Sequence, residues 1–273
     1  MSEREAVEKS DQPATIESLK KDIVRLGVRT GMVILVHSSL SSIGWVSGGP
    51  VAVIHALEDV IGPSGTLVMP THSTSLTDPS NWKNPPIPED WWQIFRDTVP
   101  AFDPDLTPTR SMGTVAEVFR KQRGAVRSDH PQWSFSAWGA LAEAVVRDHE
   151  LAFGMGEGSP LARIYDLDGY VLLLGVGHDN NSSIHLAEYR CDYPRKAVAQ
   201  EGAPVTIKGE RQWVTFNELD LSTDDFQSIG QAFEESAGGE IIRRGNIGLA
   251  ECRLMKQRPL IDFAIKWMSS NRS

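Results

Sequence analysis

Cysteine is scarce in this sequence, and so are long apolar runs. The chain of 273 residues has two cysteines, Cys191 and Cys252, too few for a disulfide framework or a four-cysteine zinc site. No apolar run reaches the roughly 18 residues that a membrane-spanning helix needs. The first residues, MSEREAVEKSDQPAT, are polar and lack the apolar region of a secretion signal. We therefore expect a cytoplasmic protein without membrane contact.

Positive charge is also in deficit. Lys and Arg number 27 against 36 Asp and Glu, which gives a formal net charge of −9. Proteins that bind nucleic acid need a basic face for the phosphate backbone, so we expect no nucleic-acid partner. An acidic protein is compatible with a cationic ligand.

What the sequence does contain is an alternation of helical and strand patterns. Apolar residues at helical spacing predict a helix over residues 16–26, and Pro50 suits the first turn of a second helix. Continuous apolar runs predict buried strands at 32–36, 66–69 and 170–176. This order predicts an α/β fold with a mostly parallel central sheet flanked by helices.

The other segments are less regular. Residues 74–109 are rich in Pro, Trp and Asp without a clear period, and we interpret them as a functional lid or wall without secondary structure. The pattern becomes β-rich after about residue 200, with a turn around Gly209-Glu210. Further helices are expected over residues 112–121, 137–147, 226–236 and 259–267. We expect a disordered arm over residues 1–13 and a single domain over residues 14–273.

Small polar residues follow the first predicted strand. The stretch from His37 through Ser38, Ser39 and Leu40 leads to Gly48-Gly49 and the helix at Pro50. Backbone N–H groups at a helix N-terminus attract anions, and ligands of open α/β sheets bind at the carboxyl ends of strands. The segment predicts an anion site, although a purely structural Ser/Gly connection fits it equally well. The P-loop pattern is absent.

Polar residues also follow the predicted strand at 170–176. His185 and Glu188 are three residues apart, so on a helix they share one face. A carboxylate that holds an imidazole fixes its tautomer and orients it as a general base. The alternative is an incidental pair on a surface helix. The nearby glycines lack the third glycine of a dinucleotide-binding fingerprint.

Two other chemistries compete for these residues. A metal site would draw on His37, His72, His178 and His185 with Asp179 and Glu188, but HExxH and HxxEH are absent and we expect no metal. Serine hydrolysis would use Ser39 as nucleophile with His185 as base, but GxSxG does not occur.

A third candidate segment precedes the predicted helix at 112–121. The sequence TPTRSMG at 107–113 places Arg110 and several hydroxyl groups at a helix start, where they can bind phosphate. A capped helix start with a surface arginine fits the segment as well. The run GMGEGSPL at 154–161 indicates a flexible loop before a helix that starts with proline.

Taken together, these segments resemble the aminoglycoside 3-N-acetyltransferases. The stretches VHSSLSSIGWVSGG, AFDPDLTPTRSMG, AVRSDHPQWSFSAWG, GEGSPLARI, VLLLGVG, IHLAE and RRGNIGLAE stand in the family's order over about residues 16–268. The resemblance implies an enzyme that acetylates the 3-amine of the deoxystreptamine ring of aminoglycosides with acetyl-CoA, which confers antibiotic resistance. It also implies the family's own α/β fold, distinct from the GNAT fold, and a homodimer.

The resemblance assigns roles to individual residues. IHLAE matches the family's His-x-x-Glu, which implies His185 as general base and Glu188 as its partner. The expected coenzyme-binding residues are His37, Ser38, Ser39, Leu40, Thr71, Arg110, Ser111, Met112 and Gly113. The developing oxyanion is expected to find its donors in a backbone N–H or hydroxyl of the 37–42 loop or in the hydroxyl of Thr71. Several family members carry two adjacent histidines where this chain has His185-Leu186, a difference that bears on substrate range.

A polycationic acceptor requires carboxylates in its site. Asp78, Asp179 and Glu188 are the substrate-binding candidates, while Asp78 and Asp103 also suit turns. Trp82 and Trp91 could form a flat wall over the sugar rings or serve packing. Two alternatives stay open: an N-acetyltransferase for another small amine, such as an aminophosphonate or amino sugar, and a non-catalytic protein that binds aminoglycosides or the coenzyme.

Overall fold

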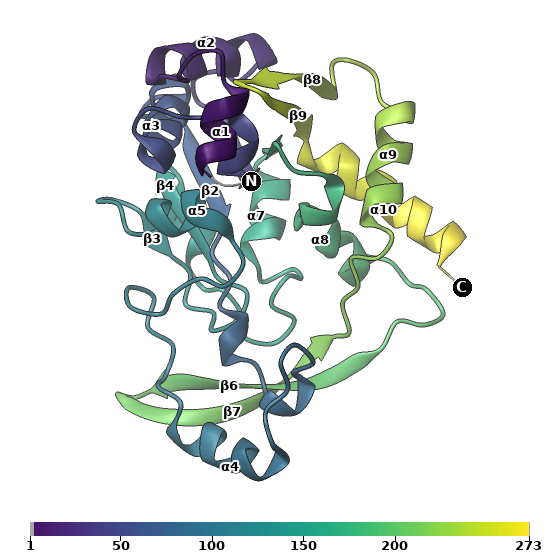
Figure 1. Ribbon diagram of the computed structural model, residues 1–273. Helices are drawn as coiled ribbons and strands as arrows, with labels where there is room; N and C mark the ends of the chain where they lie inside the picture. The colour runs from purple at the N-terminus through teal and green to yellow at the C-terminus, as the bar shows by residue number, and fades with distance from the viewer. Residues whose placement is uncertain (1–2, 273) are drawn as a thin grey trace.

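The computed structural model describes residues 3–272, and its centre is one seven-stranded sheet (Figure 1). The strand order is β3-β4-β2-β1-β5-β9-β8. The strands are β1 (Val33–Ser38), β2 (Thr66–Pro70), β3 (Val126–Arg127), β4 (Phe135–Gly139), β5 (Tyr170–Leu174), β8 (Ile242–Ile247) and β9 (Ala250–Lys256). Strand β1 pairs in parallel with β2 and β5, while β4 and β9 run antiparallel to their neighbours. Five of these seven strands therefore point the same way, which confirms the predicted mostly parallel sheet.

The continuous apolar runs arise because both faces of the sheet are covered by helices. Successive residues of β1 and β5 alternate between two core clusters, with Leu35 and Leu173 in one and Ile34 and Leu172 in the other. One face carries α2 (Ile16–Leu26), α3 (Gly49–Ile61) and α5 (Gly113–Phe119), and the other carries α6 (Ala142–Val146), α7 (Pro160–Asp166), α8 (Ser183–Arg190), α9 (Phe226–Ser236) and α10 (Gln257–Asn271). Each fully buried aliphatic side chain contributes about 1.5–3 kcal/mol.

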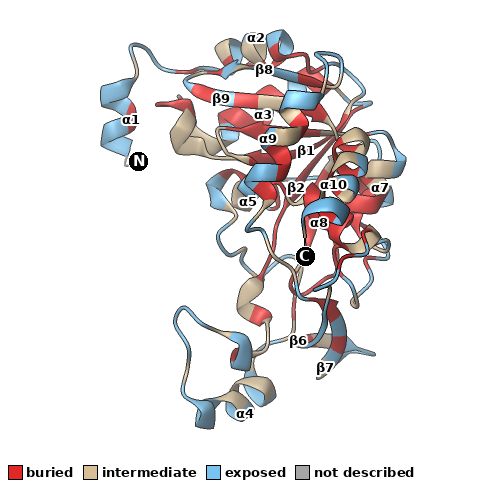
Figure 2. Cartoon of the chain, turned by 90° about the vertical axis from the view of Figure 1, so that its right-hand side faces the viewer, coloured by how far each residue is buried: buried red, intermediate tan, exposed pale blue. Residues whose placement is uncertain are grey.

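The segment 74–109 has more structure than its sequence predicts. It contains α4 (Glu89–Thr98), which packs on a separate hairpin of β6 (Val198–Ile207) and β7 (Glu210–Leu219). Phe95 of α4 contacts Trp82 and Trp213 edge-to-face, with ring centroids 5.0 and 6.1 Å away. The prediction of no secondary structure was wrong because the amphipathic pattern of α4 spans only ten residues between prolines, and none of these residues is buried in the main core. This hairpin and α4 project away from the main sheet (Figures 1 and 2).

The predicted helix at 137–147 was also partly wrong. Residues up to Gly139 form strand β4, and α6 starts only at Ala142. The strand forms because Phe135 and Ala137 enter the core beside β2, and Gly139 ends it with a φ of 110°. Helix propensity alone does not separate the strand from the helix, since alanine, a strong helix former, recurs through residues 137–144.

The N-terminal arm differs from its expected disorder. Residues 1 and 2 lie outside the described part of the chain, but α1 (Glu3–Lys9) is helical and contacts the 3-10 turn Leu40–Ile43. The arm is held because the Ser10 hydroxyl accepts a hydrogen bond from the Trp45 amide at 2.9 Å, while Ala6 is buried. The extent of a single domain from residue 14 stays a prediction.

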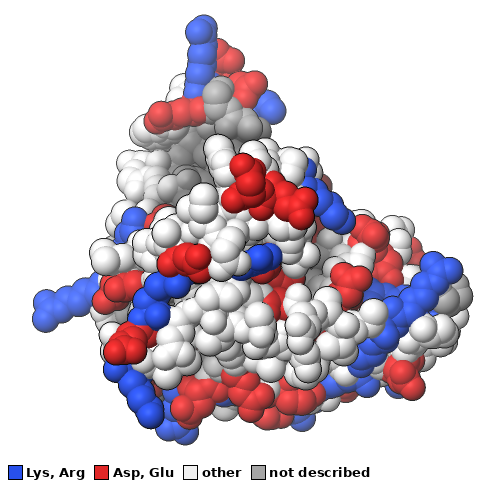
Figure 3. Space-filling model, turned by 90° about the horizontal axis from the view of Figure 1, so that it is seen from below, with Lys and Arg blue, Asp and Glu red and all other residues white. Residues whose placement is uncertain are grey.

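Other sequence-based expectations agree with the structure. The β-rich region after residue 200 is the β6–β7 hairpin, and α9 and α10 lie where the last two helices were expected. Over residues 3–272, none of the helices combines the length and apolarity of a membrane span. Charged side chains of both signs are interspersed over the hairpin end of the molecule, which Figure 3 shows from below.

Candidate active site

A cavity of about 890 Å³ opens where β1, β2 and β5 end. It is lined by His37 and Ser38 of β1, by His72 just after β2, by Val176 just after β5, and by the start of α3. The three strands are adjacent and parallel, so their carboxyl ends meet at one edge of the sheet. Ligands of open α/β sheets bind at such an edge, and the volume suits a cavity for sizeable ligands.

Most of the predicted coenzyme residues meet at this cavity. Its lining includes His37, Ser38, Ser39, Leu40, Ser111, Met112 and Gly113. At Gly113 the φ angle is 79° and a Cβ would lie 3.7 Å from the Ser38 carbonyl oxygen, so glycine suits this close approach of two loops.

Two predicted coenzyme residues are placed differently. Thr71 is fully buried, and its hydroxyl hydrogen-bonds with Ser134 and Ser136 at 3.5 and 3.3 Å. It does not belong to the cavity lining, so the structure does not support it as an oxyanion donor. Arg110 is exposed and immediately precedes the lining residue Ser111, with its amide bonded to the His72 carbonyl at 2.9 Å.

His185 is the third residue of α8 and lines the cavity. Its Nδ1 lies 2.5 Å from Oε2 of Glu188, whose side chain is fully buried. A carboxylate only accepts hydrogen bonds, so Nδ1 carries the proton and Nε2 is left with its lone pair. The ring packs against Phe226 at a centroid distance of 4.7 Å. The pair can therefore take a proton from a ligand in the cavity.

The other oxygen of Glu188 is held by a residue that the sequence analysis missed. Oε1 accepts hydrogen bonds from Arg272 Nη1 at 2.7 Å and from the Ser222 amide at 3.3 Å. Arg272 also binds both oxygens of Asp225 at 2.7 Å, and its guanidinium lies over the Tyr193 ring. The buried carboxylate is thus paired on both sides, which offsets the cost of its desolvation. No spacing signal links Arg272 to Glu188 in the sequence.

Two further imidazoles face the cavity in neutral form. Burial, with a smaller contribution from nearby His185, lowers the pKa of His37 and of His72 to about 3 each. His72 Nδ1 donates to the Ser134 carbonyl at 3.1 Å, while Nε2 of His72 and Nε2 of His37 are buried without a hydrogen-bond partner among the described residues. Uncharged rings at these positions do not repel a cationic ligand.

Of the four histidines considered for a metal site, His37, His72 and His185 line the cavity and His178 does not. His178 is turned away and its Nε2 lies 2.8 Å from Glu234, which also binds Arg244 and Arg253. In the part of the chain that the structure describes, no group of three His, Cys, Asp or Glu side chains is placed to hold a metal ion. The Ser39 hydroxyl bonds with those of Ser41 and Ser42, so the structure does not form the Ser39–His185 pair of a serine hydrolase.

The predicted acceptor-binding carboxylates separate into two groups. Asp179 is exposed and lines the cavity. Asp78 lies outside the lining and forms two hydrogen bonds with Arg96, at 2.9 and 2.8 Å. Asp103 accepts bonds from the amides of Asp105 and Leu106, the turn role that its sequence context also suggested.

The tryptophans of the insertion serve the hairpin lobe. Trp82 donates from Nε1 to the Thr77 hydroxyl at 2.8 Å and packs on Phe95. Trp91 is 54% exposed. Neither lines the cavity, so the packing interpretation holds for Trp82 and the wall over the sugar rings is not formed by these residues.

A buried carboxylate, an oriented imidazole and a cavity of this size define a group-transfer enzyme that deprotonates its nucleophile. The family model described as aminoglycoside 3-N-acetyltransferase matches residues 35–269. The chain is 45% identical over 271 residues to the SPbeta prophage-derived aminoglycoside N(3')-acetyltransferase-like protein YokD of Bacillus subtilis, covering 99% of this chain and 98% of that protein. It is 34% identical to aminoglycoside N(3)-acetyltransferase VII of Streptomyces paromomycinus, covering 98% and 96%. The chain belongs to the aminoglycoside 3-N-acetyltransferase family.

Solved structures give the same result. The crystal structure of YokD from Bacillus subtilis superimposes with a TM-score of 0.95, covering 98% of each chain at 45% identity. The structure of AAC-IIIb in a binary complex with CoASH has a TM-score of 0.85 at 32% identity, covering 96% and 98%. That of AAC-VIa bound to sisomicin has a TM-score of 0.86 at 26% identity, covering 96% and 100%. The family's own α/β fold is therefore the fold of this chain.

Proposed function

We propose that this protein transfers an acetyl group from acetyl-CoA to the 3-amino group of the deoxystreptamine ring of aminoglycosides. Membership of the family supports the reaction, as do one relative bound to CoASH and another bound to sisomicin. The observation in this chain that carries the proposal is the His185–Glu188 pair, 2.5 Å apart, at a cavity of about 890 Å³. Acetylation of the antibiotic would confer resistance.

The start of α3 suits the anionic part of the coenzyme. Gly49 and Pro50 line the cavity, and this thirteen-residue helix has no side-chain cap at its N-terminus. A Cβ built on Gly49 would meet nothing within 4 Å, so the backbone there is open to an approaching ligand. The Gly49 amide is bonded to the Val46 carbonyl at 3.0 Å and Pro50 has no N–H, so the positive end of the helix dipole is what favours phosphate at this position. The exposed Arg110 beside Ser111 would add a positive charge at the other rim.

His185 would serve as the base that activates the acceptor. Its Nε2 would take a proton from the substrate amine, whose lone pair then forms the new amide bond. Bound acetyl-CoA would supply an acetyl group activated as a thioester. Its C–S bond would break as the amide bond forms, and the coenzyme would leave as the thiol after taking up the proton held by His185. The 37–42 loop offers backbone N–H groups and the hydroxyls of Ser39 and Ser41 as donors for the developing oxyanion.

The carboxylate partner of His185 is held from both sides. Glu188 Oε2 lies 2.5 Å from Nδ1 of His185, and Glu188 Oε1 accepts a hydrogen bond from Arg272 at 2.7 Å. These contacts would fix the orientation of the imidazole before the substrate amine arrives.

The acceptor side of the cavity would suit a polycation. Asp179 contributes a carboxylate, while the rings of His37 and His72 remain uncharged at neutral pH. Glu188 would act through His185, because it is fully buried behind that ring. Substrate binding by Asp78 has no support from the site, since Arg96 already pairs with it.

One assay separates this proposal from its alternatives. Free thiol released from acetyl-CoA is measured without acceptor, with sisomicin or gentamicin, and with simple amino sugars and aminophosphonates. Thiol release that requires the aminoglycoside, with the product acetylated at the 3-amine by NMR, supports the proposal. Release with only the small amines would favour the broader N-acetyltransferase, and binding without release would favour a non-catalytic protein.

The setting of the protein in the cell is also proposed. We expect a cytoplasmic enzyme, where acetyl-CoA is produced, and a homodimer, the most frequent assembly of soluble proteins. Light scattering of the purified protein would give its mass directly. Lower antibiotic susceptibility of cells that express the wild-type chain, compared with His185→Ala, would link turnover to resistance.

A further inference from the structure

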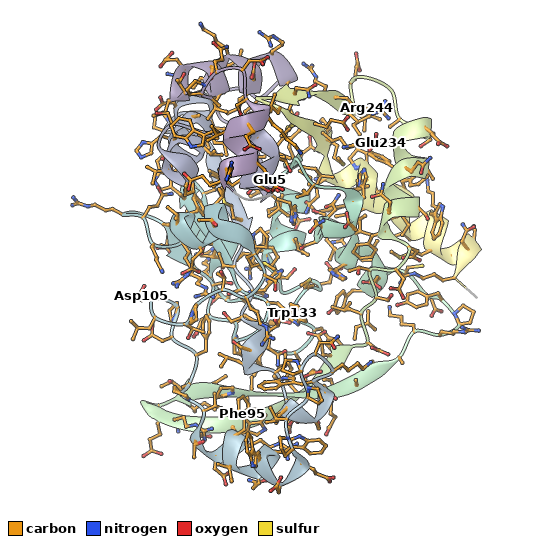
Figure 4. The ribbon with its side chains drawn as sticks, viewed as in Figure 1. Glu5, Phe95, Asp105, Trp133, Glu234 and Arg244 are labelled. Atoms are coloured by element: carbon orange, nitrogen blue, oxygen red, sulfur yellow. The ribbon has the colours of Figure 1, made fainter. Side chains whose placement is uncertain are left out.

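Two ring nitrogens with no protein partner belong to neighbouring side chains of the cavity wall. They are Nε2 of His72 and Nε1 of Trp133, both buried and both without a hydrogen bond within residues 3–272. Both residues line the cavity, and their rings meet edge-to-face with centroids 5.4 Å apart. Figure 4 shows Trp133 at the end of the main body that faces the β6–β7 hairpin. Unpaired buried polar atoms are uncommon in native proteins because each costs free energy.

The hydrogen-bonding role of each nitrogen is fixed by chemistry. His72 Nδ1 lies 3.1 Å from the Ser134 carbonyl oxygen, which only accepts, so Nδ1 must carry the proton. The ring is neutral at physiological pH because its pKa is lowered to about 3, chiefly by burial. Nε2 is therefore an acceptor. The indole Nε1–H of Trp133 is a donor only.

We propose that His72 and Trp133 recognise a hydroxyl group of the acceptor substrate, close to the amine that reacts. The hydroxyl would donate to His72 Nε2 and accept from Trp133 Nε1–H. This inference rests on the proposed function and names a substrate class for it: amines that carry a hydroxyl group on the same ring system.

Other functional groups match only half of this pair. An ammonium donates but has no lone pair to accept from Trp133, and an ether or carboxylate accepts but has nothing to give to His72. A neutral amine has both properties, but the reacting amine must keep its lone pair for attack. A hydroxyl satisfies both ring nitrogens at once.

The site would discriminate between amines with and without the hydroxyl, because an amine without it leaves both ring nitrogens unpaired. When a substrate lacks the hydroxyl, the two buried groups lose water without gaining a partner, and sites built this way reject such analogues strongly. His72 and Trp133 would thus act as specificity-determining residues beside His185.

The test compares two diamines of the same skeleton. 2-Deoxystreptamine carries hydroxyls on its ring, and cis-1,3-diaminocyclohexane carries none. We expect His72→Phe and Trp133→Phe each to lower kcat/KM for 2-deoxystreptamine about 10–100-fold, the cost of an unpaired buried group. For cis-1,3-diaminocyclohexane the change should be under about twofold. Comparing each variant with wild type on one diamine cancels the different intrinsic reactivities of the amines.

Controls separate recognition from folding. In His72→Gln the amide oxygen can accept a hydrogen bond at the same place. This variant should therefore keep more of the preference for 2-deoxystreptamine over cis-1,3-diaminocyclohexane than His72→Phe does. Trp138→Phe replaces a partly buried tryptophan of β4 that does not line the cavity. It should leave the ratio of kcat/KM for the two diamines unchanged. Melting temperature and coenzyme affinity of each variant show whether the site is intact, and calorimetric binding of both diamines gives the same comparison without turnover.

The outcomes are distinct. The inference would be overturned if the variants lost kcat/KM equally on both diamines, or if the wild-type protein bound both diamines with equal affinity. Either result would leave acetyl transfer itself in place. A protein that releases no thiol with any aminoglycoside would instead contradict the proposed function.

Discussion

Arg272 Nη1 lies 2.7 Å from Oε1 of Glu188, the carboxylate whose other oxygen contacts His185. The arginine is itself fixed by two hydrogen bonds of 2.7 Å to Asp225. The His185–Glu188 pair is therefore the inner part of a chain of charged groups that reaches the end of helix α10. Such a chain holds the carboxylate that orients the imidazole.

The first prediction concerns the base. His185→Ala should lower kcat about 10²–10⁴-fold, the usual effect of losing a general base. Coenzyme affinity, measured by calorimetry, should stay within about twofold because the imidazole acts on the amine. Glu188→Gln should lower kcat as well by changing the orientation of the ring. Wild-type turnover in a folded His185→Ala protein would remove His185 from the mechanism.

Arg272 provides a prediction about positioning. Arg272→Gln removes the cation that holds Oε1 of Glu188, so the carboxylate orients His185 less firmly and kcat should fall, while coenzyme affinity stays within about twofold. Removing one member of a buried ion pair also destabilises a protein, by up to about 3–5 kcal/mol. The matched control is Arg25→Gln, since Arg25 pairs with Asp22 at the surface with 77% of its side chain exposed. An unchanged kcat with a lower melting temperature would make Arg272 purely structural.

Stability should fall in mild acid because of the buried histidines. The pKa of His37 and of His72 is lowered to about 3 in the folded protein, from about 6.5 in the unfolded chain. Between these values only the unfolded state binds the proton, so stability is highest above about pH 6.5 and declines as the pH falls toward 3. Each ring contributes up to about 1.4 kcal/mol per pH unit in that window. The free energy of unfolding, measured by chemical denaturation at pH 7, 6 and 5, should fall less steeply with decreasing pH in His72→Gln than in wild type. An identical dependence on pH in the two proteins would refute the lowered pKa of His72.

Coenzyme binding should depend on Arg110. Arg110 is exposed and directly precedes Ser111, which lines the cavity, so Arg110→Ala should weaken acetyl-CoA binding more than it changes kcat. Arg123→Ala, at another exposed arginine outside the lining, serves as the control. Equal coenzyme affinity of wild type and Arg110→Ala in calorimetry would show that Arg110 is an ordinary surface residue.

The acceptor should be attracted by Asp179. Asp179→Asn should raise KM for sisomicin and leave KM for acetyl-CoA unchanged, and added salt should raise the wild-type KM, because the Debye length is only about 8 Å at physiological ionic strength. Asp90→Asn, at an exposed position in α4, should have no effect. A KM that responds neither to salt nor to Asp179→Asn would indicate an acceptor that is not a polycation.

Local pattern alone predicted a large part of the fold. Strands β1, β2 and β5 are continuous apolar runs because helices cover both faces, and α2 and α9 have the bounds that their periodicity indicated. The pattern was insufficient for α4, which packs on a hairpin rather than into the core, and for β4, whose identity depends on pairing with β2.

The sequence by itself also determined the contact between His185 and Glu188, because they are three residues apart on one helix and α-helical geometry brings them together. Only the tertiary structure decided which residues surround that pair. Arg272 is 84 positions from Glu188 and reaches it because α10 packs beside α8, while Thr71 and Asp78 are engaged by Ser134 and Arg96 away from the cavity. Contacts within one helical turn follow from the backbone geometry, whereas contacts over such separations exist only when the core fixes where each element lies.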